Sequence, residues 1–281
     1  MYGTILVPID GSPASINAFD CSVSIARATG ATIRAMLVVE PVEYELADED
    51  STVRSATRRR GRETLSSVVE SGAAADLTID RDVREGVPYQ EIVALAESKA
   101  DLIVLGTRGL TAEAGPGSTT QRVLSTSETP VLAVPTDASL PDDGPRCVLA
   151  ATDGSESASR TADHALELAA NVESAVDILH VIDETNPALA DPSQPMDELV
   201  RQGGHDLVER LRTAASERDL SVTTAVTRGV PGEEITSRAS TVDADLIAMG
   251  TRGRATPAAQ LLGGTTVRVL RQTDRPVLLS Q

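Results

Sequence analysis

Residues 244–253 read Ala244-Asp245-Leu246-Ile247-Ala248-Met249-Gly250-Thr251-Arg252-Gly253, and the chain continues at 262–266 as Leu262-Gly263-Gly264-Thr265-Thr266. A short apolar run ends at Gly250, a second glycine follows at Gly253, and Gly263 precedes a helical pattern. In this order a buried strand delivers a glycine-rich loop to the start of a helix. Backbone amides and the helix dipole at such a start favour an anion. The stretch therefore predicts an anion-binding site.

The same arrangement occurs earlier, where residues 101–109 read DLIVLGTRG and residues 117–120 read GSTT. Other segments also recur: LVPIDGS at 6–12 is matched by LAATDGS at 149–155, and GVP at 86–88 by GVP at 229–231. The shift between matching positions is 143 for LVPIDGS and for GVP, 144 between Asp101 and Asp245, and 146 between Gly117 and Gly263. A single long repeat indicates tandem duplication. We predict a first domain at 1–136, a linker rich in proline and acidic residues at 137–145, and a second domain at 146–281.

Apolar runs alternate with helical patterns along each half. In the first half, strands are expected at 3–9, 33–39, 77–83, 102–105 and 130–134, with helices between them and an acidic loop at 42–50. Such alternation leaves little room for hairpins and predicts a parallel sheet with helices on both faces. The fold class is therefore α/β, with two Rossmann-like domains in tandem.

Composition limits the possible partners. The formal net charge is −17 over 281 residues, which disfavours nucleic acid and anionic membranes as partners. A strongly acidic surface also suits a cytosol of very high salt, and we expect a halophilic source. Cys21 and Cys147 form neither a disulfide framework nor a zinc motif. With no signal-peptide pattern and no long apolar run, the sequence predicts a soluble cytoplasmic protein.

Taken together, the repeated motifs resemble the universal stress protein family, with two UspA-like domains in one chain. The resemblance covers nearly all of both halves, and its most specific part is the family's ATP-binding pattern G-x2-G-x9-G-[S/T] after strand four. It implies a five-stranded parallel sheet in each domain with strand order 3-2-1-4-5, in which strands one and four flank a ligand-binding switch point. The family also pairs strand five in antiparallel dimers. Residues 131–134 and 277–280 could make that contact within one chain as a pseudo-dimer, which could pair again as a homodimer.

The glycines of the motif have two interpretations. Gly106 and Gly250, with Gly109 and Gly253, either let a ribose or phosphate approach the backbone and permit positive φ, or serve a tight turn. Gly117 and Gly263 are expected to offer free amides to phosphates at a helix start, together with Ser118. Ser118 is otherwise an ordinary N-cap. The second half has Gly264 in place of that serine, and Thr265 or Thr266 could supply the missing hydroxyl.

The remaining candidates follow from the resemblance. Asp10 and Asp153 correspond to the aspartate that contacts the nucleoside of ATP, although each could simply form an Asx turn. Val38 and Val181 match the position whose backbone reads the adenine edge, and Pro8 matches the first-half pattern, where the second half has Ala151. Arg108 and Arg252 either pair with phosphate or are solvated loop residues. His180, at the end of an apolar strand, is interpreted as a packed residue.

The two halves depart from the pattern differently. The second keeps nine residues between Gly253 and Gly263, whereas the first has only seven between Gly109 and Gly117. A loop two residues shorter loses up to about 7 Å of reach. We therefore predict that the second site is the more competent.

The function predicted from these observations is a stress-response or regulatory module that binds ATP, alone or with Mg²⁺. The alternative is a scaffold of the same fold that has lost the ligand. The chain lacks the G-x-x-x-x-G-K-[S/T] and G-x-S-x-G motifs, and no base is placed to activate water. We therefore expect no dedicated enzyme activity beyond weak ATP hydrolysis or autophosphorylation, no catalytic residue and no structural metal.

Overall fold

The protein is described by a computed structural model that covers residues 2–40, 50–71, 74, 76–109, 116–187, 193–253 and 262–281. The strands of the first half are β1 (Thr4–Pro8), β2 (Thr32–Val39), β3 (Ile79–Glu85), β4 (Leu102–Gly106) and β5 (Val131–Val134). Those of the second half are β6 (Cys147–Ala151), β7 (Ala175–Asp183), β8 (Val222–Gly229), β9 (Leu246–Gly250) and β10 (Val277–Ser280).

Helices connect the strands within each half. The first half has α1 (Pro13–Thr29), α2 (Asp50–Ser71), α3 (Pro88–Lys99) and α4 (Ser118–Thr126). The second has α5 (Glu156–Asn171), α7 (Gln194–Ser216), α8 (Pro231–Thr241) and α9 (Gly264–Gln272). The predicted acidic loop at 42–50 lies almost entirely outside the described residues.

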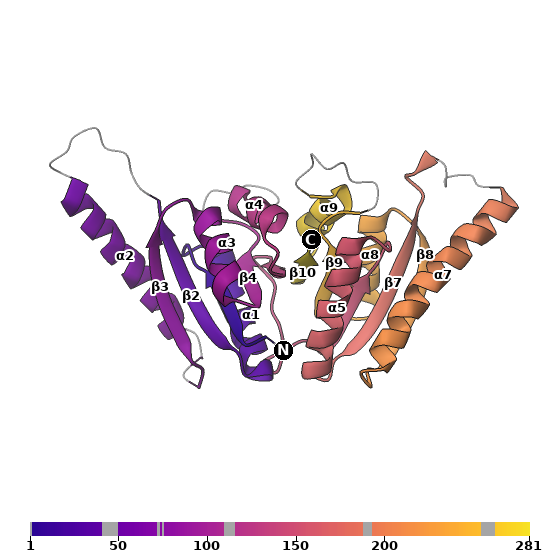
Figure 1. The fold of residues 1–281 in the computed structure, drawn as a ribbon, viewed down its shortest axis with the longest axis horizontal. Helices are drawn as coiled ribbons and strands as arrows, with labels where there is room; N and C mark the ends of the chain where they lie inside the picture. The colour runs from indigo at the N-terminus through magenta and orange to yellow at the C-terminus, as the bar shows by residue number, and fades with distance from the viewer. Residues whose placement is uncertain are drawn as a thin grey trace.

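The strands form one ten-stranded sheet in the order β3-β2-β1-β4-β5-β10-β9-β6-β7-β8 (Figure 1). Each half keeps the expected order 3-2-1-4-5, and the two sets of five strands are continuous in one sheet because β5 and β10 pair antiparallel, the contact suggested for residues 131–134 and 277–280. Leu132 lies opposite Leu278 at the centre of that pair. Both strands are short and buried along their whole length. Pairing removes two apolar edges that would otherwise invite aggregation.

Helices cover both faces of the sheet, and each face has one hydrophobic core that runs through both halves. Helices α1, α2, α5 and α7 pack on one face around residues such as Phe19 and Leu166. Helices α3, α4, α8 and α9 cover the other face, around residues such as Leu95 and Val269. Apart from Phe19 and Tyr2, the buried hydrophobic side chains are aliphatic or sulfur-containing, as the low aromatic content predicts.

In each half, the aspartate of the Asp-Leu-Ile segment forms hydrogen bonds that connect the starts of two neighbouring strands. Asp101 precedes β4, and its Oδ2 accepts hydrogen bonds from the amides of Gly3 and Thr4 at 2.8 and 2.9 Å. Asp245 does the same for the amides of Arg146 and Cys147. These carboxylates satisfy strand-end donors that have no ladder partner.

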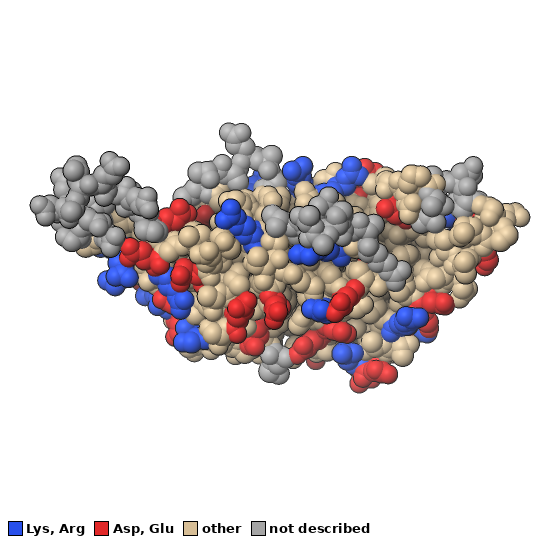
Figure 2. Space-filling model, turned by 45° about the horizontal axis from the view of Figure 1, so that its top comes forward, with Lys and Arg blue, Asp and Glu red and all other residues tan. Residues whose placement is uncertain are grey.

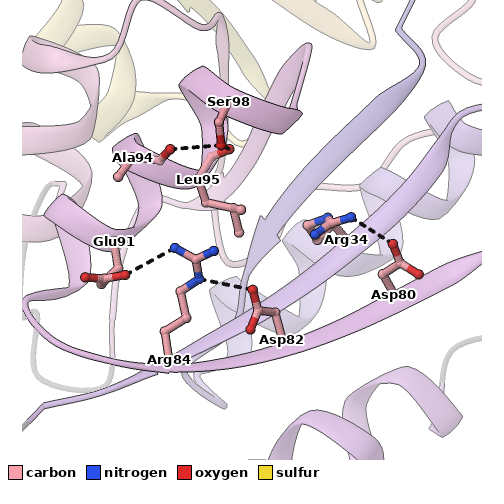
Figure 3. Close-up of polar contacts among 8 residues, drawn as sticks. All are labelled: Arg34, Asp80, Asp82, Arg84, Glu91, Ala94, Leu95 and Ser98. Carbon is pink, nitrogen blue, oxygen red and sulfur yellow. Dashed lines mark hydrogen bonds and ion pairs between the residues drawn. The ribbon is translucent and has the colours of Figure 1, made fainter.

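Ion pairs on the outer strands differ between the halves. Figure 3 shows Arg84 between Asp82 and Glu91, and Arg34 of β2 reaching Asp80 of β3 at 2.9 Å. The position of Arg34 is taken in the second half by Asp177, which is 1% exposed. Arg238 of α8 donates to both Asp177 oxygens, from Nε at 2.9 Å and from Nη2 at 2.6 Å, and the Thr223 hydroxyl also donates to Asp177. The hydrogen bonds that Arg238 donates to the Asp177 carboxylate raise the pKa of Arg238.

Candidate functional site

A cleft of about 1100 Å³ opens at the carboxyl ends of β6 and β9 in the second half. These strands are neighbours in the sheet although the chain reaches β9 much later, which is the switch point where open α/β sheets bind ligands. All the second-half candidates line this cleft: Asp153, Val181, Gly250, Arg252, Gly253, Gly263, Gly264 and Thr265. The structure therefore brings the predicted residues together at one site.

The Asp-Gly-Ser turn links the two strands at the switch point. Asp153 Oδ1 accepts from the Ser155 amide at 2.9 Å, which is the Asx turn predicted as one alternative. Ser155 caps α5, and its hydroxyl donates to the Arg252 carbonyl at 3.3 Å. Gly154 between them has a positive φ of 73°, which glycine adopts readily. In the first half the corresponding bonds join Asp10, Ser12 and Arg108.

The second glycine of the motif faces the aspartate. A Cβ at Gly253 would lie 2.8 Å from Asp153 Oδ2, and one at Gly109 would lie 3.0 Å from Asp10 Oδ2. A side chain at either position would therefore push against the carboxylate. Glycine at these positions lets the Oδ2 atoms of Asp153 and Asp10 lie beside the loop backbone.

The first glycine of the motif serves helix packing, which neither sequence interpretation predicted. A Cβ at Gly106 would lie 2.7 Å from the backbone carbon of Ala14, and one at Gly250 would lie 2.7 Å from the Ala158 amide nitrogen. Neither glycine has a positive φ, and neither do Gly109 and Gly253, so that part of the expectation is wrong. Gly106 and Gly250 let the first turns of α1 and α5 lie directly on the strand ends.

Substitution Gly250→Ala should therefore act on stability. The added methyl must displace the backbone of α5, and overpacking of this kind costs about 1–3 kcal/mol. We expect a lower thermal midpoint by calorimetry, whereas Gly203→Ala, where a Cβ meets no atom within 4 Å, should leave the midpoint unchanged or raise it. A Gly250→Ala midpoint equal to that of the unsubstituted protein would contradict this packing role.

The helix start offers different amides from those predicted. The Gly263 amide already donates to the Thr251 carbonyl at 2.9 Å, and the Gly117 amide donates to the Thr107 carbonyl at 2.8 Å, so neither is available to a phosphate. Both residues instead act as N-caps, and their carbonyls accept the first helical bonds, from Val267 and Gln121. The amides of the next three residues have no partner within the helix. In the second half these are Gly264, Thr265 and Thr266.

The hydroxyl groups near the helix starts have separate roles. Thr266 is buried, and its Oγ1 donates to the Gly250 and Thr251 carbonyls at 3.0 and 3.2 Å, so it cannot replace the missing serine hydroxyl. Thr120 does the same in the first half. Thr265 is half-buried and lines the cleft, and Ser118 is exposed. Thr265 therefore remains the one of the two threonines placed to meet a ligand.

Val181 presents its backbone to the cleft. Pairing of β6 with β7 ends at Leu179, whereas pairing of β7 with β8 continues to Asp183. Leu179 still accepts from the Thr152 amide at 2.9 Å. Backbone groups on a strand alternate sides, so the amide and carbonyl of Val181 point the same way as those of Leu179, past the end of β6. Among the described residues, no hydrogen bond to either group is found on that side.

The first half repeats this geometry. The Ile9 amide donates to the Met36 carbonyl at 2.7 Å, which places the backbone of Val38 beyond the end of β1. Pro8 is the last residue of β1 and is buried. The two connecting loops whose lengths differ, at 110–115 and 254–261, lie outside the described residues. The prediction that the short loop impairs the first site is therefore untested.

His180 lines the cleft and was interpreted from the sequence as a packed residue. Its Nδ1 lies 2.8 Å from the Thr152 carbonyl, which can only accept, so the ring donates through Nδ1 and leaves Nε2 as an acceptor when neutral. A Cβ at Gly204 of α7 would lie 2.7 Å from the imidazole. The first half has Leu37 and Gly61 at the matching positions. The sequence did contain one signal for His180, because this polar residue stands where the first half has the apolar Leu37.

Arginines supply positive charge around the cleft. Arg210 and Arg268 line it, and Arg268 pairs with Glu233 at 3.3 Å. Arg252 also lines it, but its Nη2 donates to the Ser125 carbonyl in the last turn of α4 at 3.4 Å, and its Nε is buried without a partner. Arg252 is therefore more than a solvated loop residue, because it joins the second-half loop to a first-half helix, and its pairing with phosphate stays a prediction.

On the described part of the face in Figure 2, acidic and basic side chains are interspersed. Within the described residues, no group of three or more His, Cys, Asp or Glu side chains is arranged to hold a metal ion. The helices described here are also too short or too polar to cross a bilayer.

Comparison with known proteins settles the family. The profile of the universal stress protein family matches residues 1–135 and again residues 145–281. The chain belongs to the universal stress protein family. It is 27% identical over 289 aligned positions to a universal stress protein of Mycolicibacterium smegmatis, covering 99% of this chain and 96% of that protein. These matches also establish two universal stress protein domains in tandem.

Solved structures agree with the fold. A universal stress protein from Archaeoglobus fulgidus has a TM-score of 0.75 and 21% identity, covering 99% of this chain and 96% of that one. A universal stress protein crystallised in complex with cAMP is 32% identical, covering 48% of this chain and 98% of that one, with a TM-score of 0.35. The first likeness concerns the fold alone, and the ligand of the second is a property of that protein.

Proposed function

We propose that this universal stress protein binds an adenine nucleotide, with ATP as the preferred ligand, in the second-half cleft. One observation supports the proposal most: the open backbone pair of Val181 and the uncapped amides of α9 line the same cleft. A backbone amide beside a carbonyl suits the donor and acceptor edge of adenine. Helix-start amides suit phosphate.

We expect the base, the ribose and the phosphates of the ligand to contact different parts of the cleft. The base would lie against β7, the ribose near Asp153, and the phosphates against Gly264 and Thr265, with Arg268 adding charge. Asp153 Oδ2 lies beside Gly253 in the cleft, and we propose that it accepts a hydrogen bond from a ribose hydroxyl. We propose a role set by occupancy of the site rather than by turnover.

Equilibrium dialysis of the purified full chain tests this proposal directly. We expect ATP to bind with a dissociation constant on the order of micromolar, in KCl at several concentrations, with denaturing mass spectrometry identifying any nucleotide carried through purification. If ATP failed to bind at every KCl concentration tested, the proposal would be refuted and the scaffold alternative would remain. A turnover above about 1 s⁻¹, an ordinary enzyme value, would instead indicate an enzyme.

Two further parts of the proposal concern the setting of the site. We propose that the β5–β10 pair serves as an intramolecular counterpart of the family's dimer contact, so that the chain is a pseudo-dimer. The charge of −17 further suggests a cytoplasm of high salt, as in halophiles. Sedimentation equilibrium at several KCl concentrations should give a monomeric chain if the contact is already satisfied internally.

A further inference from the structure

The duplicated halves differ at the start of their last strands. In the second half, Arg275 lies just before β10, and its Nε donates to the Ala244 carbonyl at 2.5 Å. Its Nη1 also meets Asp274 at 2.8 Å. Ala244 follows helix α8, and the negative end of a helix dipole favours a cation. The second half thus supplies a guanidinium from its own sequence at this place.

The first half has no such cation. Aligning Pro130 with Pro276 places Thr129 where the second half has Arg275. Ala100, the counterpart of Ala244, follows α3, and among the described residues no hydrogen bond to its carbonyl is found. A pocket of about 500 Å³ is lined there by Ala100 and Thr129, and also by Pro130, Tyr2 and His164.

The pocket carries strong negative charge. Four carboxylates line it: Glu97, Asp101, Glu128 and Glu167. Three come from the first half, and Glu167 comes from α5 of the second, so the pocket lies at the junction of the two halves. Asp101 accepts hydrogen bonds from two strand amides, and both bonds are to its Oδ2 atom. No lysine or arginine lines the pocket among the described residues.

Tyr2 gives an independent sign of a missing ligand. Its side chain lines the pocket and is 6% exposed, and its hydroxyl is buried without a hydrogen-bond partner. An unpaired buried hydroxyl costs about 1–3 kcal/mol. Burial and the charges of Glu167 and Asp101 raise the pKa of this phenol, so it stays neutral and its oxygen can accept a hydrogen bond.

We infer that this junction pocket binds a small guanidinium compound, which takes the place that Arg275 fills in the second half. The guanidinium would donate to the Ala100 carbonyl and the Tyr2 hydroxyl, with the carboxylates balancing its charge. Glu167 has another interaction partner, so Glu97, Asp101 and Glu128 are the carboxylates that would balance the guanidinium and select against a ligand that carries its own carboxylate. A decarboxylated compound should therefore bind more tightly than the corresponding amino acid.

Isothermal titration of the full chain with agmatine tests the inference, with L-arginine as the matched probe that differs by one carboxylate. The titration is made at the lowest KCl concentration at which circular dichroism shows the native fold, since salt screens exposed charges. We expect saturable agmatine binding near millimolar and at least about fivefold weaker binding of L-arginine, a modest electrostatic difference. No saturable binding of agmatine, or equal binding of the two probes, would overturn the inference.

Two variants locate the binding. Thr129→Arg gives the first half the second half's own cation, so it should abolish agmatine binding and raise the thermal midpoint. Tyr2→Phe removes the acceptor hydroxyl and should weaken agmatine binding several-fold without loss of the fold. Unchanged agmatine binding in folded Thr129→Arg protein would place the ligand elsewhere and refute the inference. ATP binding, measured on the same samples, reports separately on the nucleotide cleft.

Discussion

Replacing Arg238 with methionine should destabilise the protein by about 3–5 kcal/mol, the usual result of removing one partner of a buried ion pair. Asp177 is 1% exposed and lies within β7, so the substitution leaves a buried carboxylate without its charged partner. The Thr223 hydroxyl would remain as a donor, but it carries no charge. Methionine keeps much of the aliphatic volume of the arginine stem, so the loss reports on the charge.

The first half supplies the control for this substitution. Asp80→Asn breaks the pair with Arg34, in which the acid's side chain is 54% exposed, and an exposed pair contributes at most about 1 kcal/mol. Urea unfolding at constant KCl measures both variants without changing the ionic strength. An Arg238→Met loss no larger than that of Asp80→Asn would show that the buried pair contributes no more than a surface pair.

Much of the fold could be predicted because each half contains strong local signals. Apolar runs such as 102–105 and 246–249 are too short for helices and too continuous for a half-exposed strand, so they indicate buried parallel strands. The repeat then fixed the correspondence between halves. The pairing of β5 with β10 was suggested by the family resemblance alone, because two four-residue strands carry no local pattern that fixes their partner or register.

The sequence predicted that the second-half candidates lie together, as they do around one cleft, but not the contacts of their individual atoms. The sequence places glycine at 106 and 250, but only the packed structure reveals that α1 and α5 occupy the space a Cβ would need. Likewise, which amide of the helix start is free depends on whether Gly263 or Gly264 is the cap, a difference of one residue. The role of Arg252 could not be foreseen, because its partner Ser125 lies 127 residues away in the other half.

Asp177 and His180 had weak signals that the sequence interpretation did not use. An acid within the apolar run 175–182 conflicts with a buried strand unless a cation pairs with it, and buried carboxylates are usually paired. Its partner Arg238 comes from a helix that follows 61 residues later. Comparing the halves position by position would have identified both residues, since Arg34 and Leu37 take their places in the first half.

Replacing Gly264 with proline should weaken ATP binding by about 10–100-fold, because a hydrogen bond to a charged group contributes about 1.5–3 kcal/mol. Proline removes the amide hydrogen of Gly264 and is well tolerated at the first position of a helix. The preceding residue, Gly263, has φ −67° and ψ 147°, the extended conformation that a following proline requires. The fold should therefore survive, and the thermal midpoint should stay close to that of the unsubstituted protein.

Three comparisons make this prediction specific. Gly264→Ala keeps the amide, and its Cβ meets no atom within 4 Å, so ATP affinity should be unchanged. Adenosine should bind Gly264→Pro as well as it binds the unsubstituted protein, because the base contacts at Val181 are untouched. Ser118→Pro makes the same change in the first half and, if the second site dominates, should alter ATP affinity little. Equal ATP affinity in Gly264→Pro and Gly264→Ala would show that the start of α9 does not hold the phosphates, even if the cleft binds adenosine.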